Sequence, residues 1–391
     1  MLNFTYQNPC KIIFGRGEEK NTGKYVKEYS SNILLVYGRN SIKKSGLFDT
    51  VVNSLKEEGI TYTELSGVKG NPEMDLVYKG IELARENGID FILGVGGGSV
   101  IDTCKAISVG VPYEGDVWDF YLRKAKPQKA LGIGTVLTVV GAGSEMSMSN
   151  VVTKREEKLK RDFDNVIIVP KFSILNPELT FTVSPYQTAV GSFDALSHVM
   201  ERYFSNIPAT DVTDRLCEGL MKTIITFTPL ILKEPDNYDY RAEVMWAATL
   251  AQNNLMSTGR DGDWACHKIE HELSGEFDIA HGEGLAMIYP SWIRYVYSAN
   301  PARIRQFGRR VFDLDLEGYD DKTAAYAVAD ALENFACGIG LKTNLSSLNI
   351  NVENAKMLAE RCCWNSPTKG KFMKLNAEMI AELLLQASKE K

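Results

Sequence analysis

The chain has 391 residues, 44% of them hydrophobic, which is enough for two domains with sizeable cores. Its 44 Lys and Arg against 50 Asp and Glu give a net charge of -6, and this mixed balance argues against a general nucleic-acid binder, which carries a basic face. The strongest basic cluster, Lys154 to Arg161, is interleaved with Glu156 and Glu157 and is typical of a solvated turn.

Seven cysteines are scattered along the chain and form no Cys-x-x-Cys pair. An odd and dispersed set argues against a disulfide framework or a cysteine-rich zinc module, and it favours a reducing compartment. The first residues lack the charged and apolar regions of a signal peptide, and no apolar run approaches the roughly 18 residues that a spanning helix needs. We therefore expect a cytoplasmic protein that does not cross a membrane.

The first half of the sequence alternates short apolar runs with amphipathic segments. An extended lead at 11–14 precedes strands expected at 32–37, 60–65, 89–95, 130–137, 166–169 and 174–177. Helices are expected between the early strands, at 17–30, 47–58 and 73–87. Because such alternation implies parallel pairing with helices on both faces, residues 1–184 are predicted to form a doubly wound, Rossmann-like α/β dinucleotide-binding domain.

Beyond Thr182-Val-Ser-Pro185 the periodicity changes to that of helices. Helical segments are expected at 186–204, 210–232, 238–257, 260–274, 283–298, 301–312, 320–337, 351–363 and 376–388. We therefore predict that residues 185–391 form an all-helical second domain.

A glycine turn, Gly96-Gly97-Gly98-Ser99, stands between the strand at 89–95 and the helix that follows. Glycines there let the backbone approach a pyrophosphate, whose charge the unpaired amides at a helix start attract. The turn does not match the G-x-G-x-x-G fingerprint, and a plain tight turn is the alternative. Its place in a doubly wound pattern favours a phosphate cradle. The later glycine loop from Thr138 to Glu145 adds Thr138 as a candidate hydrogen-bonding group.

All the histidines of the chain lie in one stretch, Gly191–Glu283; they are His198, His267, His271 and His281. Asp194 lies four residues before the first of them, and the second and third have the same spacing, so each pair shares one face of a helix. The fourth is followed by Gly282 and Gly284, which are expected to let the backbone turn tightly beside the ring.

One carboxylate and three imidazoles can complete a four-coordinate site for a divalent first-row cation. A single Asp and His pair on a helix is more commonly a surface hydrogen bond. Two such pairs with a glycine-flanked histidine favour a metal site. We expect it in the helical domain, facing the nucleotide loops across a cleft.

Together these motifs resemble the iron-containing, or group III, alcohol dehydrogenases, over essentially the whole chain from Phe4. The resemblance is carried by Asn71-Pro72, Gly96-Gly97-Gly98-Ser99-x-x-Asp102-x-x-Lys105-Ala106, Gly143-Ser144-Glu145, Asp194-x-x-x-His198, His267-x-x-x-His271 and His281-Gly282-x-Gly284. It implies the dehydroquinate synthase-like architecture of that family, hydride transfer between a nicotinamide and a small aldehyde or primary alcohol, and a homodimer. The segment from Tyr37 to Gly46 resembles the NADPH-preferring aldehyde reductases and butanol dehydrogenases.

The resemblance also implies roles for individual residues. Its metal ligands fall on Asp194, His198, His267 and His281, with iron(II) as the expected ion and zinc(II) as the alternative. It leaves His271 unliganded near the substrate, where the residue either passes protons or hydrogen-bonds behind the ligands.

Family nucleotide contacts fall on Gly38, Ser41, Asn71, Gly97, Gly98, Ser99, Asp102, Thr138, Ser147, Lys160 and Val183. The chain departs from the family pattern in two places, the loop that begins at Thr138 and the position of Gly38. The family's usual paired threonines appear here as Thr138-Val139, and a later threonine is Ala142, so some hydroxyl contacts are lost.

Gly38 stands where NAD-using members of the family often carry Asp. An acidic residue at the end of this strand bonds the ribose 2′-hydroxyl and repels a 2′-phosphate. Gly38 removes that repulsion, and Arg39, Ser41, Lys43 or Lys44 can offset the added negative charge. We therefore predict NADP(H) over NAD(H). The alternatives are ordinary loop charges at these positions and an NAD(H)-preferring enzyme acting on another small alcohol or diol.

Two other functional classes are compatible with parts of the sequence. His267-Lys-Ile-Glu270-His271 fits the H-x-x-E-H pattern of inverted zinc peptidases, in which both histidines bind zinc and Glu270 activates water. That interpretation leaves Asp194, His198, His281 and the glycine loops without a role. A nucleotide-binding sensor that kept only the scaffold is disfavoured because the full set of metal-binding residues is present. The sequence therefore favours an oxidoreductase.

Overall fold

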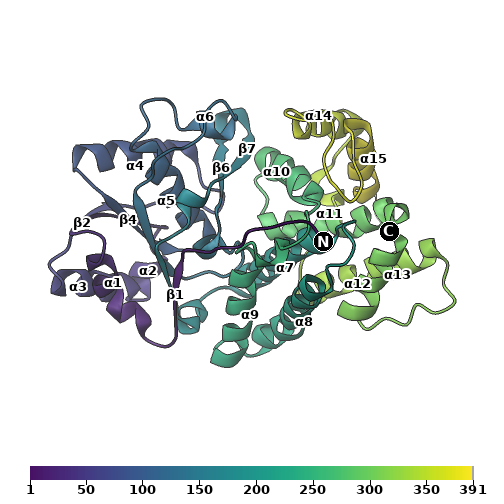
Figure 1. Ribbon diagram of the computed structural model, residues 1–391, viewed down its shortest axis with the longest axis horizontal. Coiled ribbons are helices and arrows are strands. Elements are labelled where there is room, and N and C mark those ends of the chain that lie inside the picture. The colour runs from purple at the N-terminus through teal and green to yellow at the C-terminus, as the bar shows by residue number, and fades with distance from the viewer. Residues whose placement is uncertain (390–391) are drawn as a thin grey trace. The chain divides into compact units, whose positions relative to one another are not determined.

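The computed structural model describes residues 1–389, which fall into two compact units (Figure 1). One unit is Gln7–Val183 and carries the strands; the other comprises Met1–Tyr6 and the described residues from Ser184 onward, and is helical. The sequence assigned residues 1–6 to the first unit. They group with the second because the amino group of Met1 donates to Pro208 O and Leu2 N donates to Gly259 O, each at 2.8 Å.

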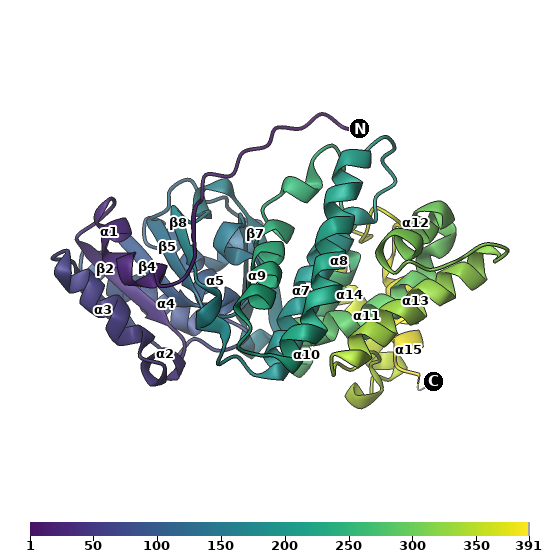
Figure 2. The same cartoon turned by 90° about the horizontal axis from the view of Figure 1, so that it is seen from below.

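The first unit is built on a six-stranded parallel sheet (Figure 2). Its spatial order is β1-β8-β5-β4-β2-β3, with bounds β1 Lys11–Phe14, β2 Asn32–Tyr37, β3 Thr61–Leu65, β4 Phe91–Gly96, β5 Gly132–Leu137 and β8 Phe172–Leu175. Strand β4 is buried along its whole length, as expected for a central strand covered on both faces. The predicted doubly wound α/β class is confirmed.

Alternate residues of β2 enter separate cores on the two faces of the sheet. Leu34 and Val36 pack in one core with apolar residues of α4, α5 and α6, and Ile33 and Leu35 pack in the other with α1 and α3. This two-sided burial follows from the period of two along a strand. The helices are α1 Thr22–Lys27, α2 Ser41–Lys44, α3 Leu47–Glu57, α4 Met74–Glu86, α5 Gly98–Gly110 and α6 Trp118–Tyr121.

One prediction in the first unit is wrong and another is right only in part. The strand expected at 166–169 is a 3-10 turn, η4 Val166–Ile168, because the Asn165 side chain accepts a hydrogen bond from Ile167 N at 3.1 Å. The solvated turn expected from Lys154 to Arg161 is present at 155–158, where Glu156 to Lys158 are exposed, but it joins two antiparallel strands, β6 Ser149–Lys154 and β7 Leu159–Asp164, and the residues after it belong to the second strand. Lys160 and Arg161 are only 4% and 6% exposed there.

The helical unit contains a helix at each position where the sequence predicts one. Their bounds are α7 Pro185–Tyr203, α8 Asp211–Lys233, α9 Tyr238–Ala251, α10 Ala265–Phe277, α11 His281–Val296, α12 Pro301–Val311, α13 Asp321–Gly338, α14 Val352–Cys362 and α15 Ala377–Ala387. Within residues 1–389, no helix is long and apolar enough to cross a membrane. All seven cysteines are free thiols.

Close packing of α11 on α7 depends on a glycine. A Cβ on Gly282 would lie 2.0 Å from Val190 O, which is backbone and cannot move aside cheaply. The tight turn predicted at His281–Gly284 is therefore wrong, because these residues form the first turn of a helix. Because Gly282 has no side chain, α11 can start directly against α7. Gly284 in turn leaves room for the side chain of Glu270, which would lie 2.8 Å from a Cβ added at Gly284.

Gly282→Ala is expected to lower the free energy of unfolding of the helical unit by about 1–3 kcal/mol, because the added methyl forces α11 away from α7. The measurement is the urea midpoint followed by the helical circular dichroism signal. Gly219→Ala in α8 is the matched control, because no heavy atom lies within 4 Å of its would-be Cβ. The control should stabilise by about 0.5–1 kcal/mol. Equal midpoints for the two variants would contradict this packing argument.

Candidate functional site

Three helices supply the predicted metal-binding side chains. Helix α7 is capped by Ser184, whose hydroxyl accepts from Gln187 N at 3.2 Å, and it carries Asp194 and His198 one turn apart. His267 lies in the first turn of α10, and His281 is the first residue of α11.

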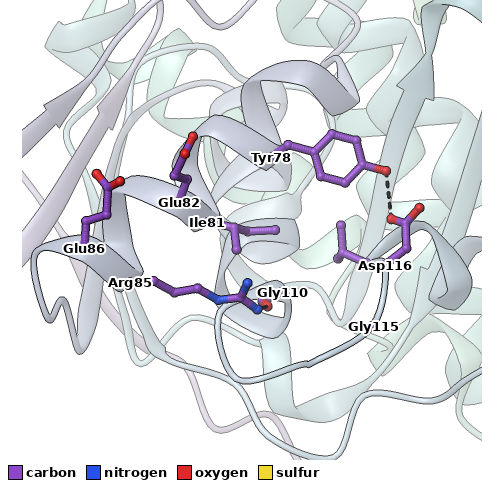
Figure 3. Close-up of a pocket in the computed structure, with 9 residues that line it drawn as sticks. Tyr78, Ile81, Glu82, Arg85, Glu86, Gly110, Gly115 and Asp116 are labelled. Carbon is purple, nitrogen blue, oxygen red and sulfur yellow. Dashed lines mark hydrogen bonds between the residues drawn. The ribbon is translucent and has the colours of Figure 1, made fainter.

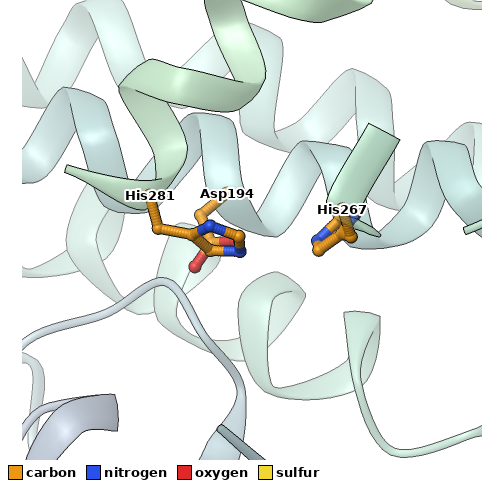
Figure 4. Close-up of side chains that lie close together, drawn as sticks. All are labelled: Asp194, His267 and His281. Carbon is orange, nitrogen blue, oxygen red and sulfur yellow. The ribbon is translucent and has the colours of Figure 1, made fainter. Parts of the chain in front are cut away.

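Asp194, His267 and His281 converge on one point (Figure 4). A ligand atom from each lies within 4.8 Å of the others, and His281 Nε2 is 3.7 Å from Asp194 Oδ1. Two of the three side chains are buried, while His281 is partly exposed. A carboxylate oxygen and two imidazole nitrogens at this separation are the donor set of a divalent transition-metal site.

His198 borders this group without belonging to it. Its Nδ1 lies 3.6 Å from Asp194 Oδ1, and its ring centre lies 4.7 Å from that of His267. Among residues 1–389, the group of close ligand atoms that contains Asp194 is completed by His267 and His281 and does not include His198. The assignment of His198 as the fourth ligand stays a prediction.

A buried glutamate orients His267. Glu201, 1% exposed, accepts from the ring Nδ1 of His267 at 2.8 Å and from its backbone nitrogen at 3.0 Å. The same carboxylate accepts from the backbone of Trp264, which holds a left-handed φ of 64° just before α10. Glu201 therefore sets both the start of α10 and the direction of the ring, and it leaves Nε2 of His267 for a metal.

His281 is held in the same way by the fully buried Glu270, which pairs with its Nδ1. Among residues 1–389, the buried His267 Nε2 and His198 Nδ1 have no hydrogen-bond partner. Because buried polar nitrogens normally have partners, a bound cation is the group that these residues fit. The Glu270 carboxylate accepts from both Ser274 and His281, an arrangement that does not suit the water-activating role of the peptidase interpretation.

Burial tunes the protonation of these groups. It lowers the pKa of His267 well below the ordinary value, and the nearby His281 adds to that effect. The pKa of His198 is likewise lowered well below its ordinary value, mainly by burial and also by the nearby His267. Both rings are therefore neutral near pH 7, which is the form that binds metals. Burial raises the pKa of Glu201 to about 7.

His271 lies one turn after His267 on α10 and is 5% exposed. Its ring centre is 5.7 Å from that of His281, and it shares a second group of close ligand atoms with Glu270 and His281. This places it beside the proposed metal ligands. Whether it relays protons stays a prediction.

The predicted nucleotide contacts begin at the carboxyl ends of neighbouring strands. Gly38 follows β2, Gly97 follows β4 and Thr138 follows β5, and these strands pair in parallel in the order β2-β4-β5. The carboxyl ends therefore meet at one edge of the sheet, which is where doubly wound folds bind nucleotides. Gly97 caps the 13-residue helix α5, whose first amides can bind a phosphate.

The glycines of this turn are also required by packing within the unit. A Cβ on Gly97 would lie 2.8 Å from Val139 Cβ, and one on Gly98 would lie 2.6 Å from Ala142 Cβ. The turn therefore packs directly against the loop that follows β5. The Ser99 hydroxyl donates to Gly70 O, which connects the turn to the loop before α4.

A buried lysine that the sequence left without a role organises the next loop. Lys105 Nζ donates to Ser144 Oγ at 2.9 Å and to the carbonyls of Ser147 and Ser149 at 2.8 Å each. Burial lowers the pKa of Lys105 to about 8. Asp102, three residues earlier on α5, accepts from Ser144 Oγ at 2.6 Å. The Asp-x-x-Lys spacing within one helix was the available signal for this pair.

Asp102 therefore has an internal role besides its predicted cofactor contact, since Val151 N also donates to it at 3.2 Å. Ser147 and Lys160 are both buried, in the loop before β6 and in β7 respectively. Ser41 begins α2, Asn71 precedes α4, and Val183 N donates to Thr180 O. Their contacts with a nucleotide stay predictions.

A surface hollow beside α4 contains none of the predicted site residues (Figure 3). The Tyr78 hydroxyl donates to Asp116 at 2.7 Å, and Arg85 donates to the carbonyls of Gly110 and Tyr113. The arginine thus caps the end of α5. We interpret this hollow as structural.

Comparison with known proteins identifies the family. Residues 9–177 match the family described as iron-containing alcohol dehydrogenase, and residues 188–388 match its C-terminal family. The chain belongs to the iron-containing alcohol dehydrogenases, and the predicted resemblance is confirmed.

Three relatives illustrate the range of similarity. The probable NADH-dependent butanol dehydrogenase 1 of Bacillus subtilis is 44% identical over 98% of this chain and 99% of its own length. The NADPH-dependent aldehyde reductase YqhD of Escherichia coli is 34% identical over 92% and 93%. The crystal structure of NADH-dependent butanol dehydrogenase A from Thermotoga maritima superposes with a TM-score of 0.95 and 38% identity, covering 100% of this chain and 99% of that one.

Glu201→Gln tests the orientation of His267. The amide keeps the shape of the carboxylate but loses the charge that favours the Nδ1–H tautomer, so we expect metal affinity to fall by about 10- to 100-fold. Competition of the purified protein with a chelator for Zn²⁺ measures this. Glu272→Gln is the control, because Glu272 is as buried on α10 but pairs with Arg361. Unchanged affinity in Glu201→Gln would show that the carboxylate does not support the ligand.

Proposed function

We propose that the chain reduces small aldehydes to primary alcohols, and catalyses the reverse oxidation, with NADP(H) and one divalent cation, iron(II) in the first instance. Membership of the family makes it an alcohol or aldehyde oxidoreductase. The observation that carries the proposal is the convergence of Asp194, His267 and His281. Zinc(II) is the alternative ion, since the same donor set suits it.

The protein's own residues prepare this chemistry. A cation held by these side chains supplies a Lewis acid that polarises the carbonyl oxygen. Glu201 and Glu270 keep the two imidazoles oriented, so no reorganisation is needed when substrate arrives. The glycine turn before α5 offers backbone amides to the pyrophosphate, which positions the nicotinamide for hydride transfer.

The choice of substrate and nucleotide follows from two kinds of argument. The relatives named above are butanol dehydrogenases and an aldehyde reductase, which supports short aldehydes as substrates. Their names include both NADH and NADPH. Our proposal of NADP(H) rests on Gly38, which removes the carboxylate that would repel a 2′-phosphate. A homodimer is part of the same proposal.

Removal of the metal with a chelator should abolish aldehyde reduction, and Fe²⁺ or Zn²⁺ should restore it, because the Lewis acid is lost while the fold remains. Metal analysis and a spectrophotometric screen of NADPH and NADH oxidation over short aldehydes check this. A higher kcat/KM with NADH than with NADPH would contradict the preference for NADP(H) that we infer from Gly38. Full activity of the metal-free protein would overturn the proposed reaction itself.

His271→Ala should lower kcat by about 100-fold or more if the ring passes a proton to the product, because a relay of this kind contributes that much. Metal content must stay at the wild-type level for the comparison to hold. Steady-state kinetics at saturating aldehyde and cofactor provide the measurement. A kcat equal to that of the wild type would make His271 a structural neighbour of the ligands.

A further inference from the structure

A buried tyrosine joins a lysine and a glutamate at the carboxyl ends of β2 and β3. Tyr37 ends β2, is 2% exposed, and donates from its hydroxyl to Glu64 Oε2 at 2.5 Å. Lys43 Nζ donates to the same oxygen at 3.3 Å. The ammonium also lies 4.4 Å from the centre of the Phe48 ring and 5.2 Å from that of Tyr37. Lys43 is therefore held by one carboxylate and two aromatic rings.

This group lies where the fold would recognise an adenosine ribose. Strand β2 is the neighbour of β4, which leads into the Gly97 turn. When a doubly wound fold binds a dinucleotide over such a turn, a residue at the carboxyl end of the neighbouring strand contacts the ribose 2′ position. That residue is Gly38 here. The next strand, β3, brings Glu64 alongside, paired in register with Leu35.

The Glu64 carboxylate acts against a 2′-phosphate in two ways. It is a like charge beside the subsite, and it engages Lys43, one of the groups that the sequence offered to balance the phosphate. The side chains of Lys43 and Glu64 are 45% and 39% exposed, so solvent screens the pair and the pair is weak. A phosphate can therefore compete with Glu64 for the ammonium.

We propose that Glu64 is a specificity-determining residue, which weakens binding of NADP(H) relative to NAD(H) by engaging Lys43. The inference rests on the proposed use of a nicotinamide nucleotide and adds the side chain that sets the balance between the two forms. Gly38 removes a repulsion of the 2′-phosphate, while Glu64 lowers the affinity for NADP(H) relative to NAD(H).

Glu64→Gln removes the charge and keeps an oxygen that can accept from Tyr37. The ratio of kcat/KM for NADPH to that for NADH should rise on the order of tenfold, as expected for loss of one partly screened like charge. The change should lie in the KM for NADPH, with kcat unaltered. An unchanged ratio would overturn the proposal. Glu28→Gln is the matched control, since Glu28 pairs with Lys11 at 3.5 Å on the surface of the same unit, and its ratio should not move.

Calorimetry with adenosine 2′,5′-bisphosphate and with AMP tests the same point without turnover. Glu64→Gln should tighten binding of the bisphosphate relative to AMP by a similar factor. Lys43→Met keeps an apolar side chain over Tyr37 and Phe48 but removes the charge, so adding Glu64→Gln to it should shift the ratio less than Glu64→Gln does in the wild-type background. A shift that survives in full in the double variant would overturn the role assigned to Lys43.

The two experiments also separate this inference from the proposed reaction. A shifted binding ratio in a protein that reduces no aldehyde with either cofactor would reject the reaction and support the role of Glu64. Aldehyde reduction with an unshifted ratio would reject the role of Glu64 and support the reaction.

Discussion

The pairing of buried carboxylates with histidine rings is the constraint on which the helical unit depends. Glu201 accepts from the ring and backbone of His267, and Glu270 holds Nδ1 of His281. Each contact is costly to break because it lies out of water, where an unpaired charge or donor is destabilising. The same contacts direct Nε2 of both rings to one point. The contacts that fix the starts of α10 and α11 are thus the same contacts that orient the candidate metal ligands.

The strand unit uses buried polar contacts in a comparable way. Lys105 gathers the carbonyls of Ser147 and Ser149 with the hydroxyl of Ser144, and Asp102 accepts from that hydroxyl. A fully buried lysine is tolerated because every donor of its ammonium has an acceptor. The loop after β5 is therefore fixed to α5 by buried hydrogen bonds, and none of these bonds requires a nucleotide.

Sequence reasoning succeeded where local pattern and burial agree. Strands β2 and β4 are almost uniformly apolar, so they were placed to within two residues. It failed where burial comes from distant partners. Lys160 and Arg161 looked solvated beside two glutamates, yet they lie in a hairpin strand. The glycines after His281 suggested a turn, but they are needed because Val190 O lies against α11. Helix spacing found Asp194 and the histidines, whereas the roles of Glu201 and Lys105 depend on His267 and Ser144, partners 66 and 39 positions away along the chain.

The amino-acid sequence by itself determined the two classes of domain, the family and the residue types of the metal centre, because periodicity and short motifs are local properties. Tertiary structure alone decided which atoms meet. It placed His198 beside the group formed by Asp194, His267 and His281, and it paired Lys43 with Glu64, a residue 21 positions away. Contacts of this kind arise when separate strands and helices pack together, and no spacing along the chain encodes them.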